Sequence, residues 1–414
     1  MNAADAARAE GGLERLGLVP TPDPRQADVL LLITCVVRQS AEDKVIGHLS
    51  SLKNLKSVRP DALFMVMGCL VDDQAALHQR FPHVDAFLRP SDTDAVLQLV
   101  RERFGLTGPT QHRAVHEPPV TALVPISEGC DHHCTYCIVT LRRGPQRSRP
   151  LPDILAEVQD WVGRGARQVT LLGQNVDAYG QDWDGAAPDL ADVLRAVHGI
   201  EGLWRIRFLT SHPSDMSQRV IQAVADLEKV CPHFELPVQA GDNGILKRMG
   251  RKYTVESYRD LLACIRRQVP VCSVATDVIV GFPGETNRQF EATCDLLQLV
   301  RFDTVHIAKY SPRPGTAAAR LEDDVPAGEK ERRRALLEKL QTQIAGEINA
   351  ALLDQSVEVL TEGRRRNRWM GRTVTNKLVF FEDANDRLRQ LASVRITWAG
   401  PWSLVGEPVH ATSE

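Results

Sequence analysis

Three cysteines fall within eight residues, in the segment Cys130-Asp-His-His-Cys134-Thr-Tyr-Cys137. Thiolates at this spacing can bind three irons of a cubane iron–sulfur cluster, which leaves the fourth iron open for a small molecule. Zinc is the competing interpretation, but structural zinc requires four closed ligands, and the fourth would have to be His132 or His133, whose spacing within the loop is awkward. Chance clustering of three core cysteines is rare. The segment therefore predicts an iron–sulfur site with one open iron.

Two further cysteines each follow a hydrophobic run. Cys35 comes after residues 28–34 and Cys69 after residues 62–68, and both runs are typical of parallel strands buried on both faces. Consecutive strand ends of a parallel α/β sheet lie on one edge, so we expect these two thiols to lie close together. Read alone, they would be buried core cysteines. The other four are interpreted as core or incidental thiols: Cys231, Cys264, Cys272 and Cys294.

Length and composition narrow the class of protein. A chain of 414 residues is too long for one ordinary core and predicts two or three domains. The longest apolar run, residues 29–37, is about half of a membrane span, and 43% hydrophobic with 25% charged residues is typical of globular proteins. Membrane, fibrous and disordered classes are therefore excluded. Arginine outnumbers lysine 40 to 10 at a net charge of −3, which favours bidentate recognition of phosphate or carboxylate.

The strand and helix patterns predict an α/β protein. In residues 1–107, two strands alternate with helices over 39–55 and 92–104, which indicates an N-terminal parallel-sheet α/β domain. After a linker at 108–119, residues 116–348 repeat strand and helix six times. This indicates a partial (β/α)6 barrel with catalytic groups at the carboxyl ends of its strands. The predicted barrel strands are 120–127, 168–173, 204–210, 234–238, 275–280 and 304–310.

The C-terminal segment changes to short β runs after a long charged helix over 329–351, so we expect a small β-barrel over 350–412. Its first turn carries five arginines around a tryptophan. Guanidinium groups grip phosphate and an indole stacks on an unpaired base, which predicts RNA binding, with a solvated loop as the alternative. The expected RNA-binding residues are Arg364, Arg365, Arg366, Arg368, Trp369 and Arg372. Four arginines after the cysteine loop are expected to guide RNA towards it: Arg142, Arg143, Arg147 and Arg149.

Longer stretches around these residues resemble the radical S-adenosylmethionine (SAM) methylthiotransferase family, and the resemblance covers nearly the whole chain. The tail motif Gly371-Arg-Thr-Val-Thr-Asn-Lys-Leu-Val379 resembles the TRAM module of the tRNA enzymes in this family. The other matching stretches are Ser127–Gly144, Gly173–Gly180, Thr210-Ser-His-Pro213, Leu236-Pro-Val-Gln239 and Asp277–Glu285. The resemblance implies a radical SAM barrel between an N-terminal methylthiotransferase domain and a C-terminal TRAM domain.

The resemblance also implies roles for individual residues. Cys130, Cys134 and Cys137 would bind a [4Fe-4S] cluster that holds and reduces SAM. The residues expected at the methionine moiety of SAM are Gly173, Gln174 and Asn175, and those expected at its ribose and adenine are Gln239, Val278 and Glu285. Without the neighbouring cluster, these glycine and glutamine positions would be interpreted as ordinary loop residues. His212 follows a barrel strand and is expected to line the site, in either a hydrogen-bonding or a catalytic role.

A second, auxiliary [4Fe-4S] cluster, the expected site of sulfur transfer, would take Cys35 and Cys69 as two of its three cysteine ligands. Family members begin with a strand followed by Gly-Cys-Gln-Met-Asn, whereas this chain begins Met1-Asn2-Ala-Ala-Asp5. We therefore expect that its start is misassigned or truncated just past the third cysteine.

The implied reaction converts C2–H of N6-dimethylallyladenosine, beside the anticodon of tRNA, to C2–SCH3. One SAM would donate the methyl group and a second would supply a 5′-deoxyadenosyl radical, since this C–H bond is not activated towards acid–base chemistry. The base must leave its stack to reach the barrel. Expected partners are the tRNA, an electron donor such as flavodoxin or ferredoxin, and a sulfur donor, for a cytoplasmic monomer with no membrane association.

Two alternatives stay open. A sister methylthiotransferase would act on threonylcarbamoyladenosine in tRNA or on an aspartate of a ribosomal protein; the arginine-rich tail favours dimethylallyl-tRNA. A catalytically impaired RNA-binding homologue would explain the missing third ligand. The intact set of Cys130, Cys134 and Cys137 argues against it.

Overall fold

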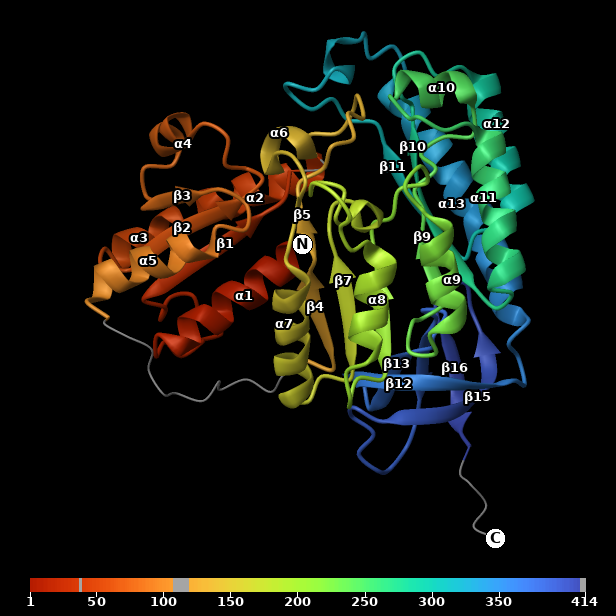
Figure 1. Ribbon diagram of the computed structural model, residues 1–414. Coiled ribbons are helices and arrows are strands. Elements are labelled where there is room, and N and C mark those ends of the chain that lie inside the picture. The colour runs from red at the N-terminus through yellow and green to blue at the C-terminus, as the bar shows by residue number, and fades with distance from the viewer. Residues whose placement is uncertain (37–38, 107–118, 410–414) are drawn as a thin grey trace. The chain divides into compact units, whose positions relative to one another are not determined.

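The computed structural model describes residues 1–36, 39–106 and 119–409 (Figure 1). The chain divides into two compact units, each of which is described by itself. The first contains residues 1–117, 128–132 and 137–146, and the second contains the rest of the chain.

The first unit is built on a parallel sheet with helices on both faces. Its strands pair in the order β1 (Val29–Thr34), β2 (Leu63–Gly68), β3 (Ala86–Leu88). Side chains of the central strand β2 alternate between two cores, because successive residues of a strand point to opposite faces. Met65 and Met67 pack with the helices at residues 2–15 and 93–104, and Phe64 packs with the helices at residues 39–51 and 74–80. The helices are α1 (Asn2–Arg15), α2 (Gln39–Ser51), α3 (Lys53–Val58), α4 (Gln74–Arg80), α5 (Thr93–Phe104) and α6 (Val139–Arg143).

The helix ends of this unit follow local signals. α5 is capped at its N-terminus by Asp92, whose carboxylate accepts a hydrogen bond from the backbone N–H of Ala95, and at its C-terminus by Gly105, which has a φ of +63°. The helix predicted over 92–104 is therefore confirmed. The single helix predicted over 39–55 is instead two helices, α2 and α3, which meet at Leu52.

The second unit contains six parallel strands in chain order, as predicted for a partial barrel. They form two three-stranded sheets, and an isolated parallel bridge between Ile206 and Val230 connects the sheets. The strands are β4 (Thr121–Pro125), β7 (Gln168–Leu172), β8 (Arg205–Phe208), β9 (His233–Glu235), β10 (Ser273–Val280) and β11 (Thr304–Lys309). A two-stranded ladder is formed by β5 (Ser127–Glu128) and β6 (Arg147–Ser148).

Helices cover the outer side of these strands (Figure 1). Apolar residues of the strands and helices form one large core, in which Val124, Leu171, Ile206 and Phe234 pack with helical residues such as Leu194. The helices are α7 (Leu151–Gly163), α8 (Leu190–His198), α9 (Gln218–Asp226), α10 (Asn243–Arg248), α11 (Val255–Gln268), α12 (Asn287–Val300) and α13 (Ala327–Ala350), with short 3-10 turns η1 (Val176–Ala178) and η2 (Ala318–Arg320).

The tail forms a closed five-stranded β-barrel, which confirms the predicted small barrel. Its spatial order is β12-β13-β14-β16-β15. Gly371 lies where two strands approach closely, because a Cβ there would lie 2.1 Å from the backbone oxygen of Leu360. The strands are β12 (Ser356–Arg365), β13 (Arg368–Arg372), β14 (Leu378–Phe381), β15 (Leu391–Ala399) and β16 (Leu404–Pro408). The predicted domain limits themselves stay predictions.

The loop between β13 and β14 covers the amino ends of the six parallel strands. Arg205 donates a hydrogen bond to the backbone oxygen of Arg372 (2.6 Å), and Arg207 donates one to that of Thr373 (2.6 Å). A cavity of about 720 Å³ lies at this junction and is lined by residues of both barrels, including Glu235. The two barrels therefore belong to one compact unit.

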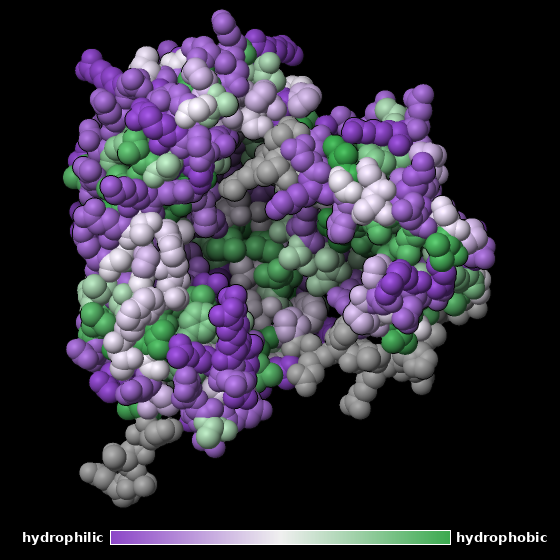
Figure 2. All heavy atoms as spheres, turned by 180° about the vertical axis from the view of Figure 1, so that it is seen from behind, coloured by the Kyte–Doolittle hydropathy of each residue, from purple (hydrophilic) through white to green (hydrophobic). Residues whose placement is uncertain are grey.

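The surface is mostly hydrophilic, as expected when the apolar side chains are packed in the cores. Hydrophilic residues make up most of the face drawn in Figure 2, and hydrophobic residues appear there in small groups. Within the described ranges, no helix is both long and apolar enough to cross a membrane.

Candidate functional site

The loop of three cysteines begins and ends at a tight closure. Gly129 has a φ of +74°, and a Cβ there would lie 2.0 Å from the backbone oxygen of Pro145, so only glycine fits. The backbone N–H of Cys130 donates to the oxygen of Gly144 (3.2 Å). Cys130, Cys134 and Cys137 are all half-buried thiols outside any disulfide. The closure thus holds three sulfur ligands on one short coil, the donor set that a site-differentiated cubane requires.

The middle of the loop is fastened within the second unit. Thr135 donates from its backbone N–H to Met249 (2.9 Å) and from its hydroxyl to the backbone oxygen of Arg248 (2.8 Å), both at the end of α10. Its own carbonyl accepts a hydrogen bond from the N–H of Ala318 (2.8 Å). Three hydrogen bonds on one residue fix the backbone beside Cys134.

Buried polar atoms gather at the carboxyl ends of the barrel strands. Ser127 Oγ, Gln174 Oε1, Asn175 Oδ1 and Gln239 Oε1 are buried, and none has a hydrogen-bond partner among the described residues. Each such atom costs about 1–3 kcal/mol, so four of them at one end of a barrel are typical of a site that receives a polar ligand. Gly173 permits this approach, because a Cβ there would lie 2.5 Å from Ser127 Oγ. This donor and acceptor set fits SAM, whose amino, carboxylate and ribose groups need such partners.

Two strand ends adopt a backbone conformation that is rare for residues with side chains. Thr210, after β8, has a φ of +70°, and Gln239, after β9, has a φ of +73°. Gln239 is held there by hydrogen bonds with the backbone of Asp277 (2.8 Å) and Ile279 (3.0 Å). Residues strained in this way concentrate at ligand sites, so these values support the interpretation of Gln239 as a site residue.

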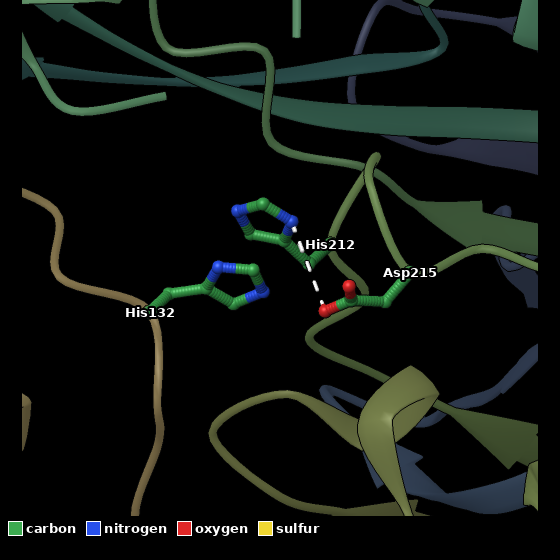
Figure 3. Close-up of side chains that lie close together, drawn as sticks. All are labelled: His132, His212 and Asp215. Atoms are coloured by element: carbon green, nitrogen blue, oxygen red, sulfur yellow. Dashed lines mark ion pairs between the residues drawn. The ribbon is translucent and has the colours of Figure 1, made fainter. Parts of the chain in front are cut away.

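A carboxylate cluster that the sequence prediction missed lies after β7 and β8. Asp177 is buried and accepts hydrogen bonds from Ser211 Oγ and from the backbone N–H of His212, both at 3.0 Å. Burial raises the pKa of Asp177 to about 7. Asp215 accepts a hydrogen bond from Asn175 Nδ2 (2.5 Å). Its Oδ2 lies 3.9 Å from His212 Nδ1, and a dashed line joins these two side chains in Figure 3. The place of Asp177 in the Gly173–Gly180 motif was the signal that could have found it.

The structure corrects the prediction for Val278 and Glu285. Val278 packs in the core shared with the outer helices, whereas Ala275, three positions earlier and therefore on the other face of β10, lines the cavity at the junction of the two barrels. The Glu285 side chain is only 1% exposed, and its Oε2 accepts hydrogen bonds from Arg333 (2.7 Å) and from the backbone N–H of Gly281 (2.6 Å). Burial raises the pKa of Glu285, opposed by these two partners. Glu285 therefore braces its loop against α13.

In the first unit, the two predicted thiols meet at one sheet edge. Thr34 and Gly68, the last residues of β1 and β2, lie opposite each other, so Cys35 and Cys69 follow at the same level. The N–H of Cys69 donates to Thr34 O (3.3 Å), and each thiol lies within electrostatic range of the other. The predicted juxtaposition is therefore confirmed. The role of the two sulfurs as iron ligands stays a prediction.

Three of the arginines expected to guide RNA form ion pairs with carboxylates of the protein. Arg143 is buried and hydrogen-bonded within the first unit, where it opposes the rise in the pKa of Cys69 that burial causes. Arg142 pairs with Asp72, and Arg149 pairs with Glu157. Of the four arginines, Arg147 is exposed. Because Arg143 is buried, the prediction that it guides RNA is wrong.

The arginine turn of the tail is only partly as predicted. Its exposed arginines, Arg364, Arg365, Arg366 and Arg368, lie on the hairpin between β12 and β13. Trp369 is 7% exposed in the core of the small barrel, and its indole N–H donates to Asp383 O (3.2 Å). Its predicted stacking on a base is therefore wrong. Arg372 donates to Asn376 O (3.1 Å) at the junction of the two barrels, away from the turn. The exposed tryptophans of the tail, missed from the sequence, are Trp398 (53%) and Trp402 (57%).

Comparisons with known proteins agree with this architecture. Residues 124–297 match the radical SAM superfamily, and residues 1–89 match uncharacterized protein family UPF0004. A tRNA-2-methylthio-N(6)-dimethylallyladenosine synthase of Roseiflexus sp. (strain RS-1) is 50% identical over 98% of this chain and 87% of its own length. Synthases of the same name from Herpetosiphon aurantiacus and Chloroflexus aurantiacus are 44% and 46% identical, over 100% and 99% of this chain and 96% and 89% of their own lengths.

The solved structures show a similar fold at low sequence identity. The radical SAM methyltransferase TsrM of Kitasatospora setae, with tryptophan and a SAM analogue bound, superimposes with a TM-score of 0.56 at 13% identity, over 76% of this chain and 66% of that one. At this identity the likeness concerns the fold alone.

Proposed function

This chain belongs to the radical SAM family of tRNA-2-methylthio-N(6)-dimethylallyladenosine synthases, and we propose that it methylthiolates C2 of N6-dimethylallyladenosine beside the anticodon of tRNA. The observation that carries the proposal is the half-buried thiol triad Cys130, Cys134 and Cys137 on a closed loop. In the second unit, the strand ends bury polar atoms that lack partners among the described residues, which supports the same proposal. Neither a threonylcarbamoyladenosine nor a protein aspartate is favoured by any feature of the site.

The family uses SAM and [4Fe-4S] clusters; the residues of this chain fit SAM and its cluster, and they supply two of the three cysteines expected at the auxiliary cluster. Cys130, Cys134 and Cys137 would hold the cluster that binds SAM, and Cys35 and Cys69 would supply two thiolates to the auxiliary cluster. When bound, the first cluster and SAM supply the radical that breaks the C2–H bond, and the second cluster supplies sulfur.

The protein's own residues would bind SAM, orient it and exclude water from it. Gln174, Asn175 and Gln239 would accept hydrogen bonds from the amino and ribose groups of SAM, because their amide oxygens lack protein partners. The hydrogen bond from Asn175 to Asp215 fixes the orientation of the amide, so that Oδ1 faces the ligand space. Preorganised dipoles of this kind need no rearrangement during the reaction.

The exposed arginines of the tail would hold the tRNA by its phosphates, which position RNA without reading its sequence. A small reducing protein and a sulfur donor complete the reaction, and we place it in the cytoplasm, with the enzyme acting as a monomer.

The experiment that tests the function uses the full chain, reconstituted with iron and sulfide under anaerobic conditions. Incubation with SAM, dithionite and tRNA carrying dimethylallyladenosine should yield 2-methylthio-dimethylallyladenosine, measured by mass spectrometry of nucleosides. The matched control is tRNA carrying threonylcarbamoyladenosine, which should stay unmodified. Modification of the control alone would assign the chain to the sister enzymes, and an iron content near zero would exclude both enzyme functions.

A further inference from the structure

Arg143 lies at the centre of a buried polar network in the first unit. Its guanidinium donates hydrogen bonds to Ser91 Oγ (3.0 Å), Asn2 Oδ1 (3.1 Å) and Asp5 Oδ2 (3.3 Å). Only 5% of the Arg143 side chain and 2% of the Asp5 side chain are exposed. The positive charge of the same guanidinium also acts on the Cys69 thiol, where it opposes the rise in pKa that burial causes. One cation therefore binds three oxygen acceptors and acts on a cysteine thiol.

The partners of Arg143 are themselves fixed at strand ends. Ser91 follows β3 with a φ of +63°, and its hydroxyl donates to Asp5 Oδ1 (2.8 Å). Asn2 Nδ2 donates to Thr34 O at the end of β1 (2.9 Å). A serine in the left-handed region costs about 1–3 kcal/mol and persists only where its surroundings hold it. The network thus connects the carboxyl ends of all three strands.

Arg143 also belongs to the segment that carries the three-cysteine loop. It is the last residue of α6 and lies six positions after Cys137. The preceding residue, Arg142, pairs with Asp72, three positions after Cys69. Two consecutive arginines therefore fasten the end of the cysteine loop to the strand end that carries Cys69.

We propose that Arg143 is a positioning residue for methylthiolation, which holds Cys69 and the iron–sulfur group bound there in a fixed place relative to the loop of Cys137. The inference rests on the proposed function. Stability alone is a weak explanation for the network, because a buried ion pair can often be replaced by apolar residues without loss of stability. A planar guanidinium with five donors can serve several acceptors and a sulfur at once, which an ammonium group cannot do in the same geometry.

A positive charge beside a ligating sulfur has a measurable consequence. It favours the more negative, reduced state of an iron–sulfur cluster and raises its reduction potential. Partners of metal ligands typically change affinity or activity by about 10- to 100-fold when they are removed. The effect of Arg143 should therefore appear in the auxiliary cluster and not in the cluster of Cys130, Cys134 and Cys137.

The test compares Arg143→Lys and the double variant Arg143→Gln/Asp5→Asn with the full wild-type chain. The double variant removes both charges, so no carboxylate is left buried and unpaired, and thermal unfolding checks its fold. The auxiliary signal in electron paramagnetic resonance is defined by its loss in Cys35→Ala/Cys69→Ala. In both variants we expect its midpoint potential to fall, and methylthiolated product per 5′-deoxyadenosine to drop by about tenfold or more. The control is Arg101→Gln, an exposed arginine on α5.

Three outcomes would overturn the proposal: an unchanged potential and product ratio in both variants, a wild-type chain without an auxiliary signal, or equal changes in Arg101→Gln. A wild-type potential and product ratio in Arg143→Lys would mean that only the charge of Arg143 matters, which would also contradict the proposed geometry. Wild-type protein could make no methylthiolated tRNA while the midpoint potential of the auxiliary cluster still falls in the variants. In that case the proposed function is wrong, and the inference that Arg143 keeps Cys69 in place is supported.

Discussion

The cysteine loop and the sheet edge present thiols by different means. Cys130, Cys134 and Cys137 are neighbours in sequence on a coil that Gly129 closes and Thr135 anchors, and all three stay half-buried. Cys35 and Cys69 are 34 positions apart and meet only because β1 and β2 pair in register. Local spacing therefore fixes the first set, whereas the fold of a whole unit fixes the second. Loss of a loop cysteine should therefore abolish both SAM cleavage and methylthiolation. Loss of a cysteine at the sheet edge should abolish methylthiolation and leave SAM cleavage.

The largest expected effect follows from Cys134→Ala. An incomplete ligand set cannot present an open iron, so 5′-deoxyadenosine formation and methylthiolation should both be abolished. The measurement is chromatography of 5′-deoxyadenosine after anaerobic incubation with SAM and dithionite. Cys264→Ala, a half-buried cysteine on α11, is the matched control and should behave as wild type. Retained cleavage in Cys134→Ala would refute the assignment of the loop.

The corresponding change at the edge, Cys69→Ala, should split the reaction. We expect 5′-deoxyadenosine formation to continue, methylthiolated tRNA to fall by more than about 100-fold, and iron to drop from about eight to about four per chain, since one cubane is lost. Iron analysis and nucleoside mass spectrometry of one preparation provide both values. Equal loss of the two products would mean that the two thiol sets do not act separately.

Removal of residues 352–414 should lower the stability of the six-stranded barrel and leave the sheet edge of Cys35 and Cys69 intact. From the sequence, the tail would only bind tRNA. The structure shows that Arg205 and Arg207 donate to carbonyls of this tail, so the truncated barrel loses charge-assisted hydrogen bonds worth about 1.5–3 kcal/mol each. We expect its thermal midpoint to fall by about 5–10 °C, measured by calorimetry. An unchanged midpoint would show that the two barrels are energetically independent.

Asp177→Asn should change how stability depends on pH. Burial raises the pKa of Asp177 to about 7, so the folded chain keeps a proton that the unfolded chain loses as the pH rises above the usual value near 3.8. This group's contribution to stability is therefore full below pH 4 and is lost between pH 4 and pH 7, by up to about 4 kcal/mol. Urea unfolding of the cluster-free chain at several pH values should show a flatter profile for the variant; parallel profiles would contradict the buried, protonated carboxyl.

The smallest effect belongs to the tail. Neutralising Arg364, Arg365 and Arg366 together should weaken tRNA binding and reduce its salt dependence by a slope of up to about three, with SAM cleavage unchanged. Filter binding at several salt concentrations measures this slope. Arg387→Gln, whose guanidinium pairs with Asp383 in the same barrel, is the control. An unaltered slope in the triple variant would place the RNA contacts on another surface.

The sequence predicted elements better than it predicted the direction of side chains. Strong periodic runs located β1, β2, the six parallel strands and the small barrel, because burial repeats at a fixed period. Val278 was misjudged because a strand buried on both faces does not show in its sequence which residues face the barrel interior. Glu285 was misjudged because its partner, Arg333, lies 48 positions away. Trp369 follows a polar turn but occupies an inward position of β13, and only the closed barrel reveals this.

The contacts between Arg205, Arg207 and the tail also set an order of events during synthesis. Arg205 is made 167 residues before the carbonyl of Arg372, and Arg207 is made 166 residues before that of Thr373. At about 5–20 residues per second, a ribosome takes on the order of ten seconds to deliver these partners. For that time the nascent barrel has its strands but no cover over their amino ends, and its two arginines face water. The tail, which is made well after the barrel strands, is therefore the part that completes the barrel.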